Sequence, residues 1–422
     1  MKPYPQDFQP STYLAAFGIS GAMSGMLMCI NTLLAMSRGL SLSQIALGFF
    51  LLSFFQVVFE VPSGMLGDLY GRKRVWVAAM ILRLIYLPIF LFGHGIIVLL
   101  CYACNGICNA LNSGTLDAMY LENWLHARGN QRLSFGTALQ QAVQFGSQAT
   151  GALLGGALST ISFFRPYTAN LLISIALCAS CLAMVAHRIP SDTGTRHGSP
   201  LSLRGLAHGF SGQITRTLRL AGTLPLVLFC LLCVLPYGFS CIGVEGYWQP
   251  RLLDLLHGQE PGMLLGMFSC AAMVGVVMGG FAADKLIRRT HTARAQAVWY
   301  LAIRITAAFL IAVMALTVHI EYFFLGYAAY YLLLGMFTCV DSVLLQAQTP
   351  DEVRGTVMSA ENLMQMTGAM AGTAVCSFWL GSGSIPGLWL FLSAAMAGGT
   401  CLCLVPVWAI QRRHQRKPLQ NV

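Results

Sequence analysis

Twelve long apolar segments, each about the length of a membrane-spanning helix, constrain the fold more than any other feature of the sequence. A helix needs about 20 predominantly apolar residues to cross the hydrocarbon core of a bilayer. Only 9% of the residues are charged, against roughly 25% in soluble domains, so much of the surface must face lipid. We therefore predict an all-α membrane protein with twelve transmembrane helices. The segments lie approximately at 12–36, 43–67, 75–93, 95–120, 133–158, 164–187, 223–248, 262–285, 295–318, 321–348, 356–380 and 387–410.

The basic residues are distributed unequally between alternate loops. If both termini are cytoplasmic, twenty Lys and Arg residues fall on the cytoplasmic side and only Arg38, Arg165 and Arg251 on the outer side. Such an excess is typical of cytoplasmic loops. We therefore expect both termini in the cytoplasm and the chain in the plasma or inner membrane. The net charge of +10 then reflects topology, and nucleic-acid binding is not expected.

The composition changes in the middle of the chain. Residues 188–222 are rich in Gly, Ser, Thr and basic residues and separate the sixth from the seventh apolar segment. This pattern predicts a cytoplasmic linker between two six-helix bundles, residues 1–187 and 223–410, followed by a basic tail at 411–422.

The two halves share short motifs in the same order along the chain. The offset between matching positions drifts around 220 residues, as differences in loop length would produce. A parallel duplication of a six-helix unit is therefore predicted. The matches include FGIS at 17–20 with YGFS at 237–240, Gly64 and Asp68 with Gly280 and Asp284, and Gly106 with Gly335.

The loop after the second segment carries a recognisable motif. Residues 64–74 read GMLGDLYGRKR, and a degraded copy, GFAADKLIRR, occupies 280–289. The first resembles the signature loop of the major facilitator superfamily, G-x-x-x-D-x-x-G-R-[KR], and the resemblance extends over the whole chain. It implies the twelve-helix fold of that superfamily, two pseudo-symmetric bundles around a central cavity, and transport by alternating access. We expect a monomer without a cofactor.

The residue types of this loop suit a gate. Glycine permits a tight turn and close helix approach, and Asp68 can hydrogen-bond Arg72 or a neighbouring helix N-terminus. Alternatively, the basic residues of GRKR at 71–74 serve only to keep this loop on the cytoplasmic side of the membrane. Asp117 and Glu122 either join the ion pair that would hold this loop in place, or they are solvated charges at a helix end. The gating candidates are Gly64, Asp68, Gly71, Arg72, Lys73, Asp117, Gly280 and Asp284.

Two further motifs bear on direction and coupling. GSQATGALLGG at 146–156 resembles the antiporter motif of efflux members, although Ala152 stands where a proline is expected. Small residues at this spacing are also ordinary helix-packing material. The R-x-x-Q-G motif of proton-coupled members lacks its arginine here, because Tyr102, Asn105 and Gly106 occupy its three defined positions.

Six ionisable side chains lie inside the apolar segments, where each costs about 2.5 kcal/mol or more unless it meets a partner or a cavity. Depth along the helices places Glu60 level with Arg83, and Arg304 level with Asp341, so each could pair, although helix rotation leaves the partners exchangeable. Such pairs either act in transport or are fixed. Two carboxylates, Glu245 and Glu361, have no obvious cation and are candidates for proton or cation binding, the alternative being boundary residues.

Polar and aromatic residues on apolar segments indicate a cavity wall, although interhelical hydrogen bonds or membrane interfaces explain them equally well. The fourteen cysteines lie in apolar segments without a set of His or acidic partners, so no metal site is predicted. The cavity candidates are Asn31, Gln140, Gln144, Tyr237 and Tyr247.

These observations lead to a functional hypothesis. We expect a secondary transporter that exports an amphipathic small molecule in exchange for protons. Uptake of a nutrient or metabolite is the alternative within transport, and a non-transporting sensor with the same fold is a more distant one. An enzyme is not expected, because the segments contain no nucleophile with a base or metal set.

Overall fold

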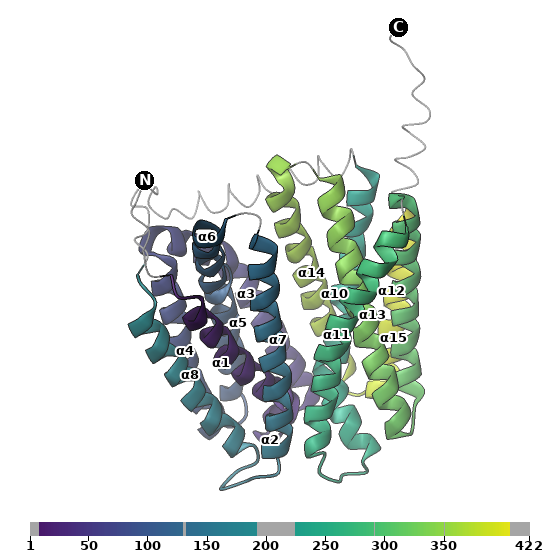
Figure 1. Cartoon of the computed structure of the whole chain (residues 1–422). Coiled ribbons are helices and arrows are strands. Elements are labelled where there is room, and N and C mark those ends of the chain that lie inside the picture. Colours follow the sequence, from purple (N-terminus) through teal and green to yellow (C-terminus); the bar gives the residue numbers. More distant parts are fainter. Residues whose placement is uncertain (1–7, 130–131, 192–223, 291, 350, 406–422) are drawn as a thin grey trace. The chain divides into compact units, whose positions relative to one another are not determined.

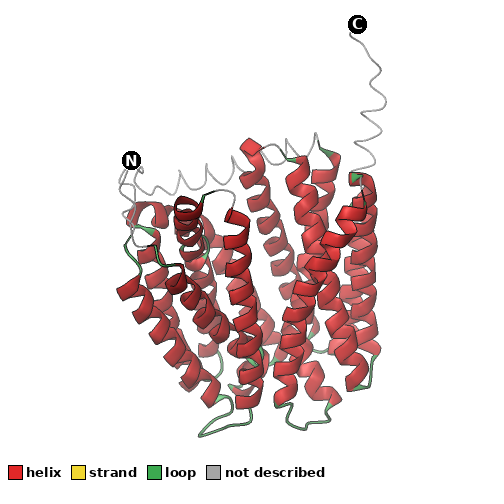
Figure 2. Ribbon diagram, in the orientation of Figure 1, coloured by secondary structure: helices red, strands yellow, loops and turns green. Residues whose placement is uncertain are grey.

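The structure, a computed structural model, describes residues 8–129, 132–191, 224–290, 292–349 and 351–405. Within these ranges the chain forms helices joined by short connections, and no strand occurs (Figures 1 and 2). Most of the predicted linker 188–222 and the tail 411–422 lie outside the described residues. The helices are α1 Pro10–Met28, α2 Asn31–Ser37, α3 Leu42–Tyr70, α4 Arg72–Phe92, α5 Ile97–Asn112, α6 Leu116–Arg128, α7 Leu133–Leu158, α8 Thr168–Arg188, α10 Pro225–Leu255, α11 Met263–Arg289, α12 Ala293–Leu316, α13 Ile320–Gln348, α14 Asp351–Trp379 and α15 Ile385–Leu402.

Every predicted span has a helical counterpart, which confirms the all-α membrane fold. Among the described residues, nine helices are long and apolar enough to cross a membrane, and α1 with α2 forms a tenth span bent by 54°. The break falls at Cys29 and Ile30, directly before Asn31. The predicted fourth span continues past Asn112 into α6 after a short turn.

Side-chain caps explain why several helices begin where they do. The Ser41 hydroxyl accepts a hydrogen bond from the Gln44 backbone N–H at 3.2 Å, and the Gln44 side chain accepts one from the Ser41 N–H at 3.0 Å. This capping box satisfies two backbone donors at the start of α3. Thr292 caps α12 and Ser384 caps α15 in a similar way.

The chain divides into two compact units, Met1–Ser202 with Leu256–Met273, and Leu203–Leu255 with Val274–Val422. In the first unit α1 packs against α7 and α8, and α4 packs against α5 and α8. The same scheme recurs in the second, where α10 packs against α14 and α15, and α12 against α13 and α15. The predicted internal duplication therefore has a structural counterpart in helix packing.

Close helix approach at equivalent glycines supports the duplication. A Cβ on Gly106 of α5 would overlap the Leu52 carbonyl of α3, and a Cβ on Gly335 of α13 would overlap the Val276 carbonyl of α11. Only glycine allows backbones to approach this closely. The match between Gly106 and Gly335 in sequence thus corresponds to the same contact in each unit.

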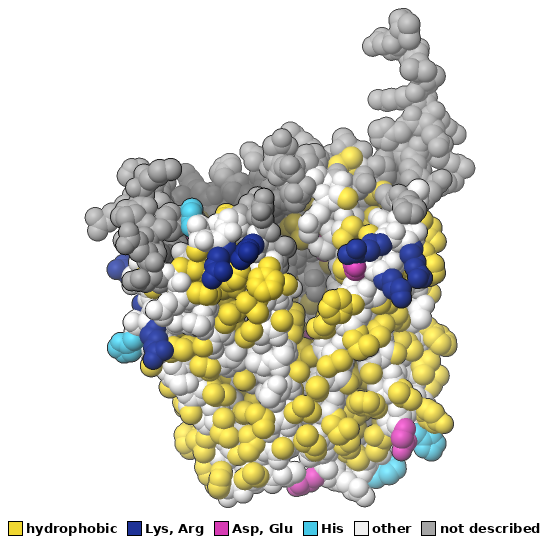
Figure 3. Space-filling model, viewed as in Figure 1, with side chains coloured by type: hydrophobic (Ala, Val, Ile, Leu, Met, Phe, Trp, Pro, Cys, Tyr) yellow, Lys and Arg dark blue, Asp and Glu magenta, His cyan; other side chains and the backbone are white. Residues whose placement is uncertain are grey.

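The outer surface of each unit is apolar along the helices. Large side chains such as Phe281 on α11, Phe309 on α12 and Phe92 on α4 are 74%, 64% and 65% exposed. Figure 3 shows hydrophobic side chains over most of the visible surface, with the Lys and Arg side chains of each unit gathered toward one end of its helices. This is the surface that a bilayer requires.

Candidate functional site

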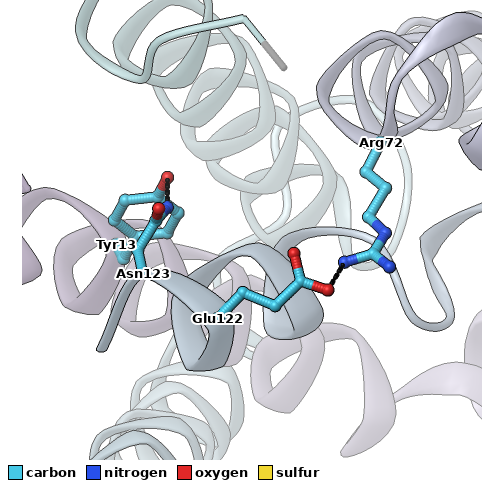
Figure 4. A network of polar contacts seen from close by, with 4 residues as sticks. All are labelled: Tyr13, Arg72, Glu122 and Asn123. Carbon is cyan, nitrogen blue, oxygen red and sulfur yellow. Dashed lines mark hydrogen bonds and ion pairs between the residues drawn. The ribbon is translucent and has the colours of Figure 1, made fainter. Parts of the chain in front are cut away.

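The turn between α3 and α4 has the geometry that the signature loop predicts. Gly71 has a φ of +95°, which favours glycine, and α4 begins at the next residue. The Arg72 guanidinium then forms an ion pair with the Glu122 carboxylate of α6 at 2.6 Å (Figure 4). The next residue of α6, Asn123, donates a hydrogen bond to the Tyr13 hydroxyl of α1 at 3.1 Å. The loop is therefore latched to α6, and α6 in turn is tied to α1.

Lys73 has a different role from its neighbours. Its ammonium group is buried and donates hydrogen bonds to the carbonyls of Ala186 at 2.8 Å and Ile189 at 2.6 Å. These carbonyls lie at the C-terminal end of α8, where the helix leaves acceptors unsatisfied and carries partial negative charge. The basic cluster at the start of α4 therefore does more than set topology: Arg72 joins α4 to α6, and Lys73 joins α4 to α8.

The remaining gating candidates form local contacts or none. The Gln140 amide of α7 donates a hydrogen bond to Asp117 of α6, so Asp117 joins this end of the unit. Among the described residues, Asp284 forms an ion pair with Arg288 on its own helix, at 2.8 Å. Neither Gly64 nor Gly280 approaches another described group closely, so the predicted helix contact at Gly64 is not found. The side chain of Asp68 lies outside the described structure.

We expect the Arg72–Glu122 latch to contribute about 0.5 to 1 kcal/mol to stability, since both side chains are partly exposed. In Arg72→Glu, two carboxylates would face each other, and the free energy of unfolding should fall by about that amount or more. The double variant R72E/E122R should recover most of the loss. A double-mutant cycle measured by unfolding in mixed micelles checks the coupling, with the exposed neighbour substitution Arg74→Glu as control. A double variant as unstable as the worse single variant would contradict the latch.

In the second unit, two carboxyl groups meet between helices. Asp341 of α13 is only 4% exposed, and its carboxyl group interacts with Glu361 on α14, Tyr300 on α12 and Cys230 on α10, while its Oδ1 has no hydrogen-bond partner in the described structure. Two carboxyl groups can share a hydrogen bond only if one of them holds a proton. Four helices thus converge on a carboxyl pair.

Arg304 lies close to this pair, but the predicted ion pair with Asp341 is not formed among the described side chains. Its guanidinium donates instead to the Tyr300 hydroxyl at 2.9 Å and to the Cys233 carbonyl. It also lies over three aromatic rings, where the ring quadrupoles attract it. The distances from its central carbon to the ring centres are 5.6 Å for Tyr237, 5.1 Å for Tyr300 and 5.0 Å for Phe337.

Glu60 and Arg83, which their depth made possible partners, form no ion pair among the described side chains. Glu60 accepts a hydrogen bond from the Ser113 hydroxyl at 3.1 Å. Arg83 is 8% exposed and donates to the Asn109 amide oxygen at 3.5 Å, while its Nε has no hydrogen-bond partner. The two side chains meet α5 at different places, Arg83 at Asn109 and Glu60 at Ser113, directly after its last residue.

Arg83 lines a cavity inside the first unit. The cavity has a volume of about 250 Å³ and is bounded by α1, α2, α4, α5 and α8. Asn31, a predicted cavity residue, is part of its wall, next to the break between α1 and α2. Apolar side chains supply the rest. The polar side chains around it are Ser24, Asn31, Arg83, Tyr86, Tyr102, Asn105 and Asn109.

The other predicted residues lie in several environments. Tyr237 and Tyr247 are buried in the second unit, 6% and 1% exposed, with Tyr237 under Arg304. Glu245 is exposed although the residues beside it on α10 are buried, and it contacts the Cys241 thiol one turn away. Gln144 is exposed on α7.

A family comparison then gives the context of these sites. The family model described as Major Facilitator Superfamily matches residues 13–373. The chain belongs to the Major Facilitator Superfamily. As a member it is a multi-pass membrane transporter rather than an enzyme, and the expectation from the signature loop is confirmed. No curated protein sequence matches it.

Solved structures of several transporters share its fold. A mutant of the nucleoside transporter NupG is 12% identical with a TM-score of 0.74, covering 94% of this chain and 98% of that one. A bacterial homologue of the human lysosomal transporter Spinster, inward-facing and unoccupied, is 13% identical with a TM-score of 0.65 and 96% of both chains covered. The POT family transporter PepTSo is 11% identical with a TM-score of 0.68, covering 96% and 99%. At these identities the likeness concerns the fold.

Three arginines of this superfamily member have a role that the sequence did not reveal. Arg38 is 1% exposed and donates to the Phe90 carbonyl at 3.0 Å, and Arg165 donates to the Phe92 carbonyl at 3.0 Å, both at the end of α4. Arg251 donates to the Thr317 carbonyl at 2.7 Å, at the end of the equivalent helix α12. Burial and the nearby charge of Arg165 lower the pKa of Arg38. The few basic residues predicted outside are thus bound to helix C-termini.

The glycines of the antiporter-like segment are occupied by helix packing. A Cβ on Gly151 would overlap the Ala22 backbone, and one on Gly155 would lie 2.9 Å from Met26 backbone atoms, both on α1. In the second unit Gly372 of α14 meets Phe239 of α10 in the same way. Packing therefore accounts for these small residues in both units of this superfamily member.

Proposed function

We propose that the chain is a proton-coupled secondary transporter in which Asp341 and Glu361 form the proton site. The observation that carries this proposal is the contact between the two carboxyl groups. In a low-dielectric interior, neighbouring carboxylates are not both ionised, so the pair holds one proton and can release it when its surroundings change.

The surroundings of Asp341 and Glu361 suit reversible binding of a proton. Arg304 remains charged under all physiological conditions and lies near the pair without neutralising it through a direct ion pair in the described structure. A rotation of α13 or α14 that separates the two carboxyl groups leaves each to interact with this charge alone. Proton release is then linked to a change in helix packing, which is the coupling that an alternating-access transporter needs.

We propose export as the direction of transport, from the resemblance of residues 146–156 to the antiporter motif, with the chain in the plasma or inner membrane and both termini cytoplasmic. With the inside negative and alkaline, proton entry is driven by both components of the gradient. A single proton site on one unit is sufficient for exchange if proton and substrate favour opposite states.

Purified protein in liposomes that contain a pH-sensitive dye tests this proposal. Small organic acids, amines and neutral solutes are added in turn under an imposed pH gradient, with protein-free liposomes as the baseline. At least one class of solute should move protons through the protein, and a reversed gradient should reverse its flux. Solute flux that ignores the pH gradient and moves no protons would overturn coupling, and accumulation in the uptake orientation alone would overturn export.

A further inference from the structure

We infer that the cavity in the first unit binds the carboxylate of a small organic acid through Arg83. The inference deepens the proposed function by naming its substrate class, and it rests on that function in treating the bound acid as the substrate. It stands on three features of the cavity, namely its charge, its walls and its size.

The charge of Arg83 has no counter-ion in the described structure. Guanidinium is always protonated, and burying it without a negative partner costs several kcal/mol. The groups that face it are neutral: the Asn109 amide, the Tyr86 phenol, and the thiols of Cys108 and Cys178. The Nε donor is buried without a partner.

The described carboxylates of helices α1 to α8 are all engaged elsewhere. Glu60 accepts from Ser113, Asp117 accepts from Gln140, and Glu122 pairs with Arg72. Asp68 precedes Gly71 by three residues on α3 and Arg83 follows it by twelve on α4. Because the chain reverses direction at Gly71, Arg83 lies about nine residues, or about 14 Å, deeper along the helices than Asp68. An anion entering the cavity is therefore the missing partner of this guanidinium.

The walls indicate what the anion is attached to. Within the described structure, Arg83 is the one cation that lines the cavity, so a monoanion neutralises it and a dianion would not. Asn31, Asn105 and Asn109 offer amide groups for a second oxygen, while Leu27, Leu87 and Phe90 form an apolar wall. A single carboxylate on an apolar body matches this distribution.

The cavity volume indicates the size of the part of the ligand that it can enclose. About 250 Å³ corresponds to roughly eight waters at about 30 Å³ each. Acids of about eight to eleven heavy atoms fit, which leads to hexanoate, phenylacetate and 3-phenylpropanoate as probes. For each acid there is a primary amide that is neutral and has nearly the same shape. Comparing the binding of the acid with that of its amide therefore measures the contribution of the negative charge.

The test is equilibrium binding of the three radiolabelled acids to the full-length protein in lipid nanodiscs. At least one acid should bind 10-fold or more tightly than its amide, and Arg83→Gln should weaken that binding 10-fold or more. The control is Arg165→Gln, which also removes one guanidinium, but one that lies outside the cavity and contacts the Phe92 carbonyl at the end of α4; it should leave binding within twofold of the wild type. If Arg83→Gln does not fold, Asn31→Leu, which removes a wall amide, narrows the cavity and keeps the charge, should weaken binding of the acids 10-fold or more.

Three results would overturn the inference: no binding of any of the three acids at 10 mM, amides that bind within threefold of the acids, or unchanged binding in Arg83→Gln. Binding is measured without a gradient, so it stands or falls separately from proton coupling. Proton-coupled flux of amines or neutral solutes, without flux of the acids, would overturn the substrate class while leaving the proposed function intact.

Discussion

Glu361→Gln is expected to abolish uphill, pH-driven transport, by about 100-fold or more, while exchange of substrate without a gradient stays within about threefold of the wild type. Gln keeps the shape of the side chain and a hydrogen bond to Asp341, but it cannot take up or release a proton. Coupling requires a proton that binds the two transport states differently, whereas exchange requires only that the states interconvert with substrate bound. The measurement is the ratio of the two fluxes in proteoliposomes.

Asp341→Asn should likewise abolish uphill, pH-driven transport while leaving exchange of substrate close to the wild-type rate. Because Asp341 and Glu361 hold one proton between them, the double variant should be no worse than either single variant, a departure from additivity that separate sites would not show. Glu321→Gln, an exposed carboxyl at the start of the same helix α13, is the matched control. Uphill transport at wild-type rates in both single variants would exclude the pair as the proton site.

The carboxyl pair shows where sequence reasoning reaches its limit. Depth along a helix follows from the rise per residue, but the sequence did not bring Asp341 and Glu361 together, because Asp341 was compared with Arg304 and Glu361 was left without a partner. Depth does not determine the direction in which a side chain points, because successive residues of an α-helix are rotated by about 100° around its axis. The pairs Glu60–Arg83 and Arg304–Asp341 were predicted by depth alone and are not formed in the described structure.

The fold itself was predictable because its determinants are local. Apolar length fixes the helices, the excess of basic residues predicts their orientation, and glycines at Gly106 and Gly335 mark equivalent close contacts. The break before Asn31 was not predicted, since the segment is apolar throughout and contains no proline at that point. The cavity arises from packing between five helices, so only Asn31 among its polar residues was singled out as a wall residue.

The outer arginines illustrate a signal that was present but not used. Only three Lys or Arg residues are predicted outside, and each of them binds carbonyl groups at a helix C-terminus. A basic residue that is an exception to the topological bias is a candidate for a structural role, because the insertion cost has to be offset by a specific contact. This reasoning applies to Arg38 and Arg251 in equivalent regions of the two units.

Lys73→Met is expected to lower the free energy of unfolding by about 2 kcal/mol, close to a 30-fold change in the ratio of folded to unfolded protein. The substitution keeps most of the apolar stem but leaves the carbonyls of Ala186 and Ile189 at the end of α8 without their charged donor. Unfolding in mixed micelles measures the loss. Arg74→Met, one residue further along α4 and exposed, removes the same charge and should cost less than about 0.5 kcal/mol.

The comparison of Lys73 with Arg74 decides what the basic cluster does in the folded protein. If GRKR served topology alone, either residue could be replaced with equal effect, because the insertion bias depends on the number of charges and not on their partners. The structure assigns them different surroundings: Gly71 forms the turn, Arg72 pairs with Glu122, and Lys73 caps α8. Equal losses in Lys73→Met and Arg74→Met would therefore contradict the capping role, whereas a loss confined to Lys73→Met would show that Lys73 stabilises the fold by capping α8.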